Sequence, residues 1–387
     1  MKDQLSWVEI SRDALSHNIK ALKSRTGQGV ILCPCVKANA YGHGLVETSR
    51  IFLESGADWL AVNALYEAET LRQAGIDAPI YIMGHTLLKD LARAWKLDCR
   101  IVVYDDETLD ALAELSGRFE KPLRLHVKVE TGNNRQGVQV ENLVDYARRI
   151  SEIDGLVLEG IATHFANIED TTNHEYAFKQ VERFKEAGEL LREAGIGALE
   201  GGKFMMHCAN SAATILYPET HFDMVRVGIA AYGMWPSSET RVSYQNLHKN
   251  GFELRPAFTW KSVVAQIKEV PADSAIGYGC TYKTTRNTRM AIVPVGYYDG
   301  YDRGLSNSSY VFIRGHRAKL LGRVCMNIIM VDVTDIPDLE IEDEVVLMGG
   351  SSDGSDKISA EQFAEWIGTI NYEVTTRVND RIPRIYT

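Results

Sequence analysis

The sequence predicts an α/β protein, with an N-terminal (β/α)8 barrel followed by a C-terminal, mainly antiparallel β domain. From about residue 30 to residue 227, short β-branched apolar runs alternate with amphipathic stretches, which is the pattern of a parallel sheet. About eight such strand-helix units fit a closed barrel better than an open doubly wound sheet. After about Ser238 the apolar period becomes two, which indicates antiparallel strands.

The barrel elements are predicted in chain order. An entry helix is expected after Ser11, because Leu15, Ile19 and Leu22 recur at helical spacing. The expected barrel strands are Val30–Val36, Trp59–Val62, Ile80–Met83, Arg100–Val103, Leu123–Val129, Leu156–Thr163, Phe204–His207 and Met224–Val227. The expected helices between them are Leu45–Leu53, Leu65–Ala74, Leu87–Trp95, Leu109–Leu115 and Phe178–Leu191.

The C-terminal part alternates strand patterns with turn residues such as Gly315 and Asp335. The expected strands are Phe258–Val264, Ala291–Pro294, Tyr310–Ile313, Ile328–Val333 and Glu344–Met348. We therefore expect a barrel over residues 1–240 and a β domain over residues 241–387, with the first residues of the chain as possible members of the β domain.

Composition restricts the class of ligand. The chain of 387 residues is 45% hydrophobic and 24% charged, which excludes a disordered protein. Its net charge of −10 argues against a nonspecific grip on nucleic acid or anionic lipid, so a small-molecule ligand is expected. No apolar run approaches the roughly 18–20 residues of a membrane span, and Met1–Leu5 lacks the apolar core of an export signal, so we predict a cytoplasmic protein.

The six cysteines are scattered along the chain and are expected to be reduced. Cys33 and Cys35 flank a proline and do not have the CxxC spacing of a metal or redox pair. Alternation along a strand places both thiols on one packed face, so no metal site is predicted.

Reactive groups of a parallel barrel belong at the C-terminal ends of its strands. The predicted strand ends carry basic side chains there, namely Lys37, Lys128, Arg135, His207 and Arg226. A cationic mouth in an acidic protein predicts a bound anion such as a phosphate or a carboxylate. Ser211 and Gly228 are typical of a barrel phosphate site, and a lysine beside a phosphate predicts pyridoxal phosphate with Lys37 as the Schiff-base amine.

The stretch Val36–Gly44 resembles the pyridoxal-phosphate attachment site of the alanine racemase family. Further stretches match the family in register and cover nearly the whole chain: Thr163–Ala166, Asn210–Ala212, Val225–Ala230, Gly277–Tyr282, Val295–Tyr301, Gly322–Met326 and Ile370–Val374. The resemblance implies a (β/α)8 barrel, a C-terminal β domain, and a head-to-tail homodimer with active sites shared between subunits.

The resemblance also implies roles. Lys37 corresponds to the base on one face of the substrate α-carbon, and Tyr278 of the partner subunit to the base on the other. The tyrosine is expected to bond to His164, which meets Arg226, and Arg226 faces the pyridine nitrogen. An arginine keeps its proton, so the cofactor is a weaker electron sink and reprotonation is favoured over transamination.

The remaining roles concern binding. The cofactor-binding positions are Lys37, Tyr41, His164, Asn210, Ser211, Arg226, Gly228, Ile229 and Tyr372; the substrate-binding positions are Arg135, Met326 and Tyr297, the last two from the partner subunit. Lys128 matches a lysine that is often carbamylated in relatives. An ordinary lysine paired with a carboxylate stays open as the alternative.

The sequence departs from the family pattern at Glu130, Asn133, Val227, Tyr298 and Asn327. Asn133 adds a polar amide to the pocket wall, and Asn327 removes a carboxylate. The leading hypothesis is interconversion of L-alanine and D-alanine to supply D-alanine for cell-wall peptidoglycan. The alternative is a serine or serine/alanine racemase of the same family, as in vancomycin-resistance systems.

Two hypotheses from other classes compete with racemisation. A pyridoxal-phosphate decarboxylase for basic amino acids would share the barrel and the Schiff-base lysine, and a cofactor-carrier protein would need only the barrel. The β domain and Tyr278 argue against both, because neither needs a base supplied by a second subunit.

Overall fold

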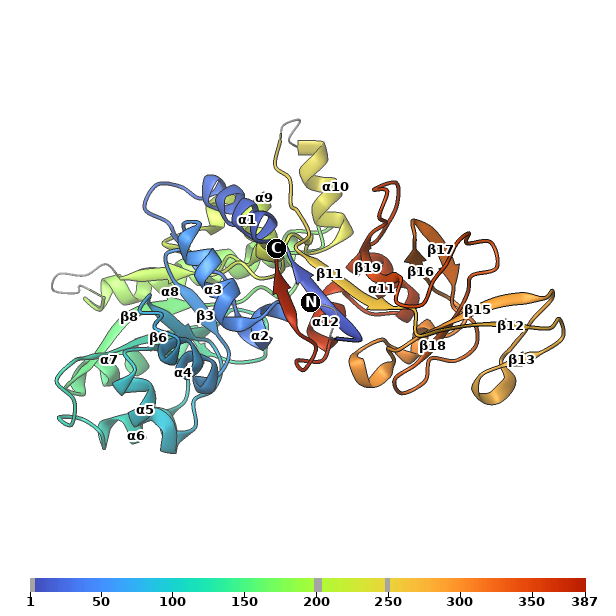
Figure 1. The fold of residues 1–387 in the computed structure, drawn as a ribbon. Coiled ribbons are helices and arrows are strands. Elements are labelled where there is room, and N and C mark those ends of the chain that lie inside the picture. Colours follow the sequence, from blue (N-terminus) through green and yellow to red (C-terminus); the bar gives the residue numbers. More distant parts are fainter. Residues whose placement is uncertain (1–3, 198–203, 248–250) are drawn as a thin grey trace. The chain divides into compact units, whose positions relative to one another are not determined.

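The computed structural model describes residues 4–197, 204–247 and 251–387 (Figure 1). Residues 1–3, which belong to the segment in which an export signal would begin, lie outside the described residues. The chain divides into two compact units. The barrel unit comprises Asp13–Ala40 and Leu45–Pro256, and the β unit comprises the N-terminal residues up to Arg12, Tyr41–Gly44 and Ala257–Thr387.

The barrel unit contains all eight predicted strands. A parallel sheet runs in the order β3 (Leu60–Val62), β4 (Ile80–Ile82), β5 (Arg100–Val103), β6 (Leu123–Glu130), β8 (Leu156–Ala162) and β9 (Met205–His207), with β7 (Val138–Gln139) beside β6. β2 (Ile31–Leu32) pairs in parallel with β10 (Met224–Val225). A bridge from Cys35 to Ala61 joins the β2 segment to β3. The Asp223 N–H donates to Met206 O at 3.0 Å and links the β10 segment to β9, so the ring closes in chain order.

The helices of this unit follow their strands. At or near the predicted places lie α1 (Arg12–Arg25), α3 (Leu45–Glu54), α4 (Leu65–Gln73), η1 (Leu88–Asp90) with α5 (Leu91–Lys96), α6 (Asp106–Ala113) and α8 (Glu175–Glu193). Elements that the sequence patterns do not predict are α2 (Lys37–Tyr41), η2 (Val140–Asn142), α7 (Leu143–Glu152), α9 (Ser211–Leu216), η3 (Pro218–Thr220), η4 (Ile229–Tyr232) and α10 (Ser238–Leu247). α9 is buried along its whole length, so it has no amphipathic period from which to predict it.

The β unit confirms the antiparallel pattern. Its larger sheet has the order β17 (His316–Lys319), β16 (Tyr310–Ile313), β19 (Glu344–Gly350), β11 (Phe258–Val263), β1 (Ser6–Ile10) and β21 (Arg384–Tyr386), with β20 (Lys357–Ile358) beside β19. A second sheet comprises β12 (Gln266–Val270), β15 (Thr288–Val293) and β18 (Ile329–Asp332), and β13 (Ala275–Ile276) pairs with β14 (Tyr282–Lys283). Short helices complete the unit: η5 (Tyr278–Cys280), η6 (Tyr297–Asp299), η7 (Arg303–Leu305), α11 (Ala360–Ile367) and α12 (Asn371–Arg377).

Strand β1 shows why the N-terminal residues belong with the β unit. It runs antiparallel to β11, with Val8 opposite Trp260, and parallel to β21. Trp260 is fully buried, and its ring lies 5.9 Å from the buried ring of Tyr301. The chain therefore contributes its first strand to a core that is otherwise built from its last 130 or so residues.

All six cysteines are free, and Cys33 and Cys35 are buried. In the described ranges, no helix combines the length and the apolar character needed to cross a bilayer.

Candidate active site

Lys37 ends the first strand segment of the barrel and opens a left-handed turn. Residues 38–40 have φ of 53–54° and ψ of 46–54°, although none of them is a glycine. The left-handed segment continues to Gly42 and Gly44, whose φ are 84° and 98°. A left-handed conformation costs an L-residue about 1–2 kcal/mol, so the surrounding structure must hold this segment.

Two side chains stabilise the turn. Glu67, buried on α4, accepts hydrogen bonds from the backbone N–H of Ala38 at 2.8 Å and of Asn63 at 2.8 Å. Asn39 accepts from the Leu45 N–H at 2.8 Å, which connects the turn to the start of α3. The strained backbone therefore presents Lys37 from a fixed position at the end of its strand.

The Lys37 ammonium group has no hydrogen bond or ion pair within the part of the chain that the structure describes. Its charge nevertheless acts on His164, which follows β8. Desolvation and the charges of Lys128, Arg226, Arg135 and Lys37 together hold the pKa of His164 well below its usual value. The structure thus brings these five predicted residues together at one end of the barrel.

Lys128 lies on β6 inside this cluster. Desolvation, followed by the charges of Arg226 and Arg135, lowers the pKa of its amine well below the usual value, while Glu130 acts in the opposite direction. A buried amine with two guanidinium neighbours is held towards its neutral, nucleophilic form.

Arg226 follows β10 and is buried. Its Nη1 donates to His207 Nδ1 and to His207 O at 2.9 Å, and its Nη2 donates to Thr163 O at 2.7 Å. Among the described residues, the hydrogen bonds of Arg226 go to His207, Thr163 and Cys208, and its charge acts on His164. The Nε–H has no acceptor in the described ranges and remains available at the barrel mouth.

His207 is predicted from the sequence to be one of the cations of the mouth, and that prediction is wrong. Its Nδ1 accepts a hydrogen bond from Arg226, which can only donate, so this nitrogen carries no proton. Burial and the charge of Arg226 hold the pKa of His207 well below its usual value. The ring is therefore neutral, and the positive charge at this position belongs to Arg226.

Ser211 begins α9 and forms a small cradle with the segment after β10. Its Oγ accepts from the backbone N–H of Gly228 at 2.8 Å and of Ala230 at 3.3 Å. Ile229, between these two residues, begins η4. A hydroxyl surrounded by backbone amides is suited to the oxygen atoms of a phosphate group.

Asn210 precedes the cradle and caps α9. Its Oδ1 accepts from the Ala213 N–H at 3.1 Å, and its Nδ2 donates to Glu169 at 2.6 Å. Both ends of the amide are therefore used within the protein. Asn210 positions the helix that carries Ser211.

The loop after β6 is held by two of the residues that depart from the family pattern. Glu130 accepts from the backbone N–H of Gly132 at 2.5 Å and of Arg135 at 3.3 Å. Asn133 donates to the backbone carbonyls of His164 at 3.3 Å and of Phe165 at 3.1 Å. The Asn133 amide N–H groups are thus used to fasten two loops, which corrects the expectation that they enlarge the polar surface of the pocket.

The other predicted residues lie in the β unit. Tyr41 and Tyr372 face each other with ring centroids 6.1 Å apart. Tyr278 begins η5 after Gly277, whose φ is 69°, and its side chain is 72% exposed. Tyr278 also lines a cavity in this unit with apolar side chains that include Ile276 and Met330.

The segments of Tyr297 and Met326 are joined to one another within the β unit. The Tyr297 N–H donates to Cys325 O at 3.1 Å, and the Tyr298 N–H donates to Met326 O at 3.0 Å. Tyr297, Met326 and Tyr278 are all exposed large side chains. Asn327, beside them, donates to Asp299 at 3.3 Å, so its amide also has a partner inside the protein.

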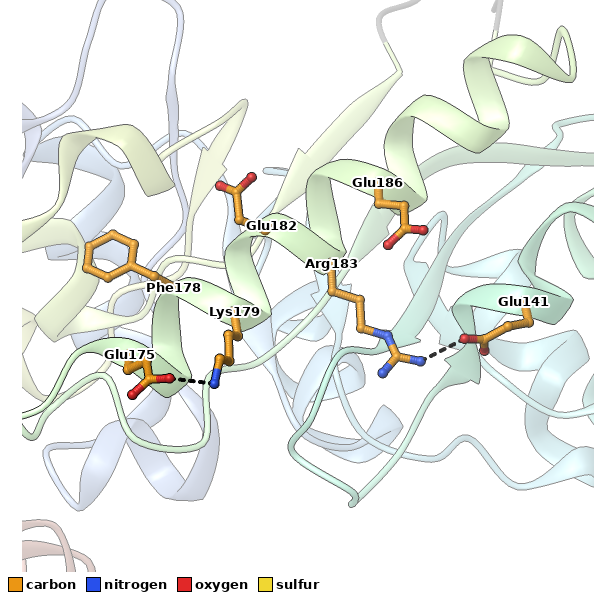
Figure 2. A pocket seen from close by; sticks show the side chains of 7 residues that line it. All are labelled: Glu141, Glu175, Phe178, Lys179, Glu182, Arg183 and Glu186. Atoms are coloured by element: carbon orange, nitrogen blue, oxygen red, sulfur yellow. Dashed lines mark hydrogen bonds and ion pairs between the residues drawn. The ribbon is translucent and has the colours of Figure 1, made fainter.

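A further cavity lies on the surface of α8 and contains none of the predicted residues (Figure 2). Glu175 pairs with Lys179 at 2.6 Å, and Glu141 pairs with Arg183 at 3.0 Å, and all four side chains are exposed. Solvent screens exposed pairs of this kind and they add little to stability, so this is a solvated helix face.

Four positioning residues are missed by the sequence analysis: Glu67, His126, Glu159 and Gln180. Gln180 of α8 is buried; it donates to Thr131 Oγ1 at 3.2 Å and accepts from the Ala166 N–H at 2.9 Å. His126 and Glu159 lie inside the buried strands β6 and β8. Glu159 interrupts an otherwise apolar strand, which is the signal that could have revealed it, whereas the strand of His126 carries several other polar residues.

The buried histidines predict that stability falls in acid. The pKa values of His164, His207 and His126 are lowered in the folded protein, so below about pH 6.5 the unfolded chain binds more protons and the free energy of unfolding decreases. Each such proton contributes up to about 1.4 kcal/mol per pH unit. Urea unfolding should give a smaller free energy of unfolding at pH 5.5 than at pH 7.5. In His164→Gln this difference between the two pH values should be smaller by about 1 kcal/mol. His316→Gln, an exposed residue of β17, is the matched control; an undiminished loss in His164→Gln would contradict the prediction.

The strand ends of this closed parallel barrel carry a buried guanidinium, a cradle of one hydroxyl and two backbone amides, and a lysine amine without a hydrogen-bond partner among the described residues. This combination is characteristic of an enzyme that holds a small anionic ligand at that end. Residues 10–236 match the model of the alanine racemase N-terminal domain, and residues 257–386 match that of the alanine racemase C-terminal domain. The chain belongs to the alanine racemase family and is an isomerase.

Individual alanine racemases are similar to this chain over nearly its whole length. An alanine racemase of Leptospira interrogans is 40% identical over 100% of this chain and 97% of its own length, and one of Methanococcus maripaludis is 39% identical over 98% of each. The solved alanine racemase of Clostridium difficile 630 matches with a TM-score of 0.90 and 33% identity, covering 100% of this chain and 97% of that one. A Bacillus anthracis alanine racemase solved with bound L-Ala-P matches with a TM-score of 0.90 and 34% identity, covering 99% and 95%.

Proposed function

We propose that the protein interconverts L-alanine and D-alanine with pyridoxal phosphate as cofactor. The observation that carries the proposal is the Lys37 amine, which has no partner among the described residues and belongs to the residue that opens a strained turn, near the charges of Arg226, Arg135 and Lys128. We also propose that the enzyme is a cytoplasmic homodimer with shared active sites, and that it supplies D-alanine for cell-wall synthesis. The names of the relatives support alanine as the substrate.

The residues of the barrel unit fit the cofactor at three points. The Lys37 amine is free to bond covalently to an aldehyde. Ser211 with the backbone at Gly228 and Ile229 suits the phosphate. Tyr41 and Tyr372 belong to the β unit, and we assign them to the phosphate only by their family positions. The Nε–H of Arg226, unused among the described residues, suits the ring nitrogen. When bound, the cofactor supplies the electron withdrawal that makes the α-proton of an amino acid acidic.

Two bases act on opposite faces of the α-carbon in this proposal. Lys37 removes or returns the proton on one face, and Tyr278 of the partner subunit does so on the other, with His164 beside it. Arg226 donates a hydrogen bond but keeps its proton, as arginine does in proteins, so it limits electron withdrawal and favours immediate return of the proton to the α-carbon. Arg135, with Met326 and Tyr297 of the partner subunit, is assigned to the substrate carboxylate and the entry passage.

Serine is the less favoured substrate. Asn133 and Asn327 are the two residues that suggest serine, and the side-chain amides of both donate hydrogen bonds within the protein. Asn133 donates to backbone carbonyls of the loop after β8, and Asn327 donates to Asp299. We therefore expect kcat/KM for L-serine to be at least about tenfold below that for L-alanine, because a hydroxyl left without a hydrogen-bond partner costs about 1–3 kcal/mol. Serine turnover equal to alanine turnover would overturn this assignment.

The test of the function is exchange at the α-carbon. Purified protein with L-alanine in D2O should invert the substrate and introduce deuterium at the α-carbon, and Tyr278→Phe should lose most turnover. Tyr298→Phe, which changes another exposed tyrosine of the β unit, is the matched control. Loss of CO2 without inversion would indicate a decarboxylase, and bound cofactor without exchange would indicate a carrier protein.

We further propose that Lys128 is carbamylated. Its amine is held towards the neutral form, which adds CO2 to give a carbamate and releases one proton. The product is an anion between Arg226 and Arg135, where it relieves the repulsion of the two guanidinium groups. Protein equilibrated with 13C-bicarbonate should show a carbamate carbon signal that is absent from Lys128→Met. The same signal in Lys128→Met would place the modification elsewhere, and no signal in the wild type would leave an ordinary lysine.

A further inference from the structure

A line of buried side chains runs from Arg226 across the barrel interior to Glu159. Arg226 Nη1 bonds to His207 Nδ1; His207 Nε2 lies 2.7 Å from His126 Nδ1; and His126 Nε2 lies 3.1 Å from Glu159 Oε2. The four groups come from β10, β9, β6 and β8 or the residues that follow them. All four are less than a tenth exposed.

The chemistry of the two ends fixes every proton in this line. An arginine can only donate, so His207 Nδ1 accepts and the His207 proton is on Nε2. That proton is donated to His126 Nδ1, so the His126 proton is also on Nε2 and is donated to the Glu159 carboxylate. Only one arrangement of tautomers satisfies all three hydrogen bonds.

Glu159 is the acceptor on which this arrangement depends. Its Oε2 also accepts from Arg100 Nε at 3.2 Å, and its Oε1 lies 3.3 Å from Arg124 Nε. Burial opposes ionisation, but the hydrogen bond from His126 and the charge of Arg100 outweigh it and lower the pKa of Glu159. An ionised carboxylate has no proton to donate, so it cannot reverse the direction of the line.

We propose that Glu159 is a positioning residue that, through His126 and His207, fixes the tautomer of His207 and so the orientation of Arg226 at the cofactor-binding end of the barrel. With His207 protonated on Nδ1, two donors would face each other and Arg226 would be displaced. Among the described residues, the Nε–H is the only one of the five N–H groups of Arg226 that has no acceptor. The inference rests on the proposed function only where it takes the cofactor's ring nitrogen as the partner of the Arg226 Nε–H.

The first measurement needs neither substrate nor cofactor. Protein labelled with 15N-histidine is examined by long-range 1H–15N correlation, with signals assigned by His126→Gln and His207→Gln. We expect both rings to be neutral and protonated on Nε2. A proton on Nδ1 of either ring, or a doubly protonated ring, would overturn the inference.

The second measurement uses a graded series at Glu159. Glu159→Leu removes the acceptor, and we expect a mixture of His126 tautomers, a dissociation constant for pyridoxal phosphate raised about tenfold, and a shifted absorption band of the bound cofactor. Glu159→Gln keeps an acceptor oxygen and should retain the His207 tautomer with a change in affinity below about threefold. Asp98→Asn is the matched control, because Asp98 pairs with Arg124 at 3.5 Å but has no contact with the line.

The outcomes separate this inference from the proposed function. Cofactor affinity and spectrum unchanged in Glu159→Leu would overturn the positioning role even if the enzyme racemises alanine. Failure of the wild type to bind cofactor would instead remove the proposed function, while the tautomers would still be measured. If Glu159→Leu does not fold, the tautomers of the wild type and of Glu159→Gln decide the matter.

Discussion

Replacing Lys37 with alanine should lower the rate of alanine racemisation by at least about 10³-fold, because the substitution removes both the proposed covalent anchor of the cofactor and one of the two proposed bases. The fold should survive the change. Lys37 makes no hydrogen bond or ion pair with the described residues, so the free energy of unfolding should move by less than about 0.5 kcal/mol. The measurements are a chirality assay with L-alanine and urea unfolding of the same preparations.

The matched control is Lys20→Ala, which removes an exposed lysine of α1 and should leave both quantities unchanged. Racemisation by Lys37→Ala within tenfold of the wild type would show that Lys37 is not the base. A large loss of stability would instead mean that its amine supports the left-handed turn.

Replacing Gly233 with alanine should be among the most destabilising single changes in the barrel unit. Gly233 has φ of 87° and ends η4, the short helix that begins beside the cradle formed by Ser211. An added Cβ would lie 1.8 Å from Arg255 O and 2.1 Å from its carbonyl carbon, and neither backbone atom can move aside alone. We expect a loss of about 3–5 kcal/mol, seen as a fall of about 10 °C in the unfolding midpoint.

Gly29→Ala separates the cost of the left-handed backbone from the cost of the steric clash with Arg255. Gly29 has φ of 81°, but an added Cβ would meet no atom within 4 Å, so the substitution should cost only the left-handed conformation, about 1–2 kcal/mol. Equal losses in the two variants would show that the clash with Arg255 relaxes without cost. In Gly233→Ala we also expect weaker binding of pyridoxal phosphate, since η4 begins at Ile229, next to Gly228 of the cradle.

The order of the barrel strands can be predicted from the sequence because each strand is a short apolar run between amphipathic helices. The rule that reactive groups lie at strand ends also predicts Lys37, Lys128, Arg135 and Arg226 as members of one barrel mouth. Tyr278 is different, since it lies on a short 3-10 helix of the β unit and is predicted only by resemblance to a known family. Helix α7 is missed although its sequence has the apolar periodicity of an amphipathic helix: Leu143, Tyr146 and Ile150 are buried at helical spacing.

The fold class and the lysine at the barrel mouth could be predicted from the sequence alone, because they depend on residue types and their periodicity, and the family could be predicted from the resemblance of local motifs. Only the tertiary structure decided where the polar side chains find their partners. The direction of the Asn133 amide, the neutral state of His207 and the line from Arg226 to Glu159 each depend on strands 19 or more residues apart in the chain. Hydrogen bonds act over about 3 Å, so their partners are fixed only when the barrel closes.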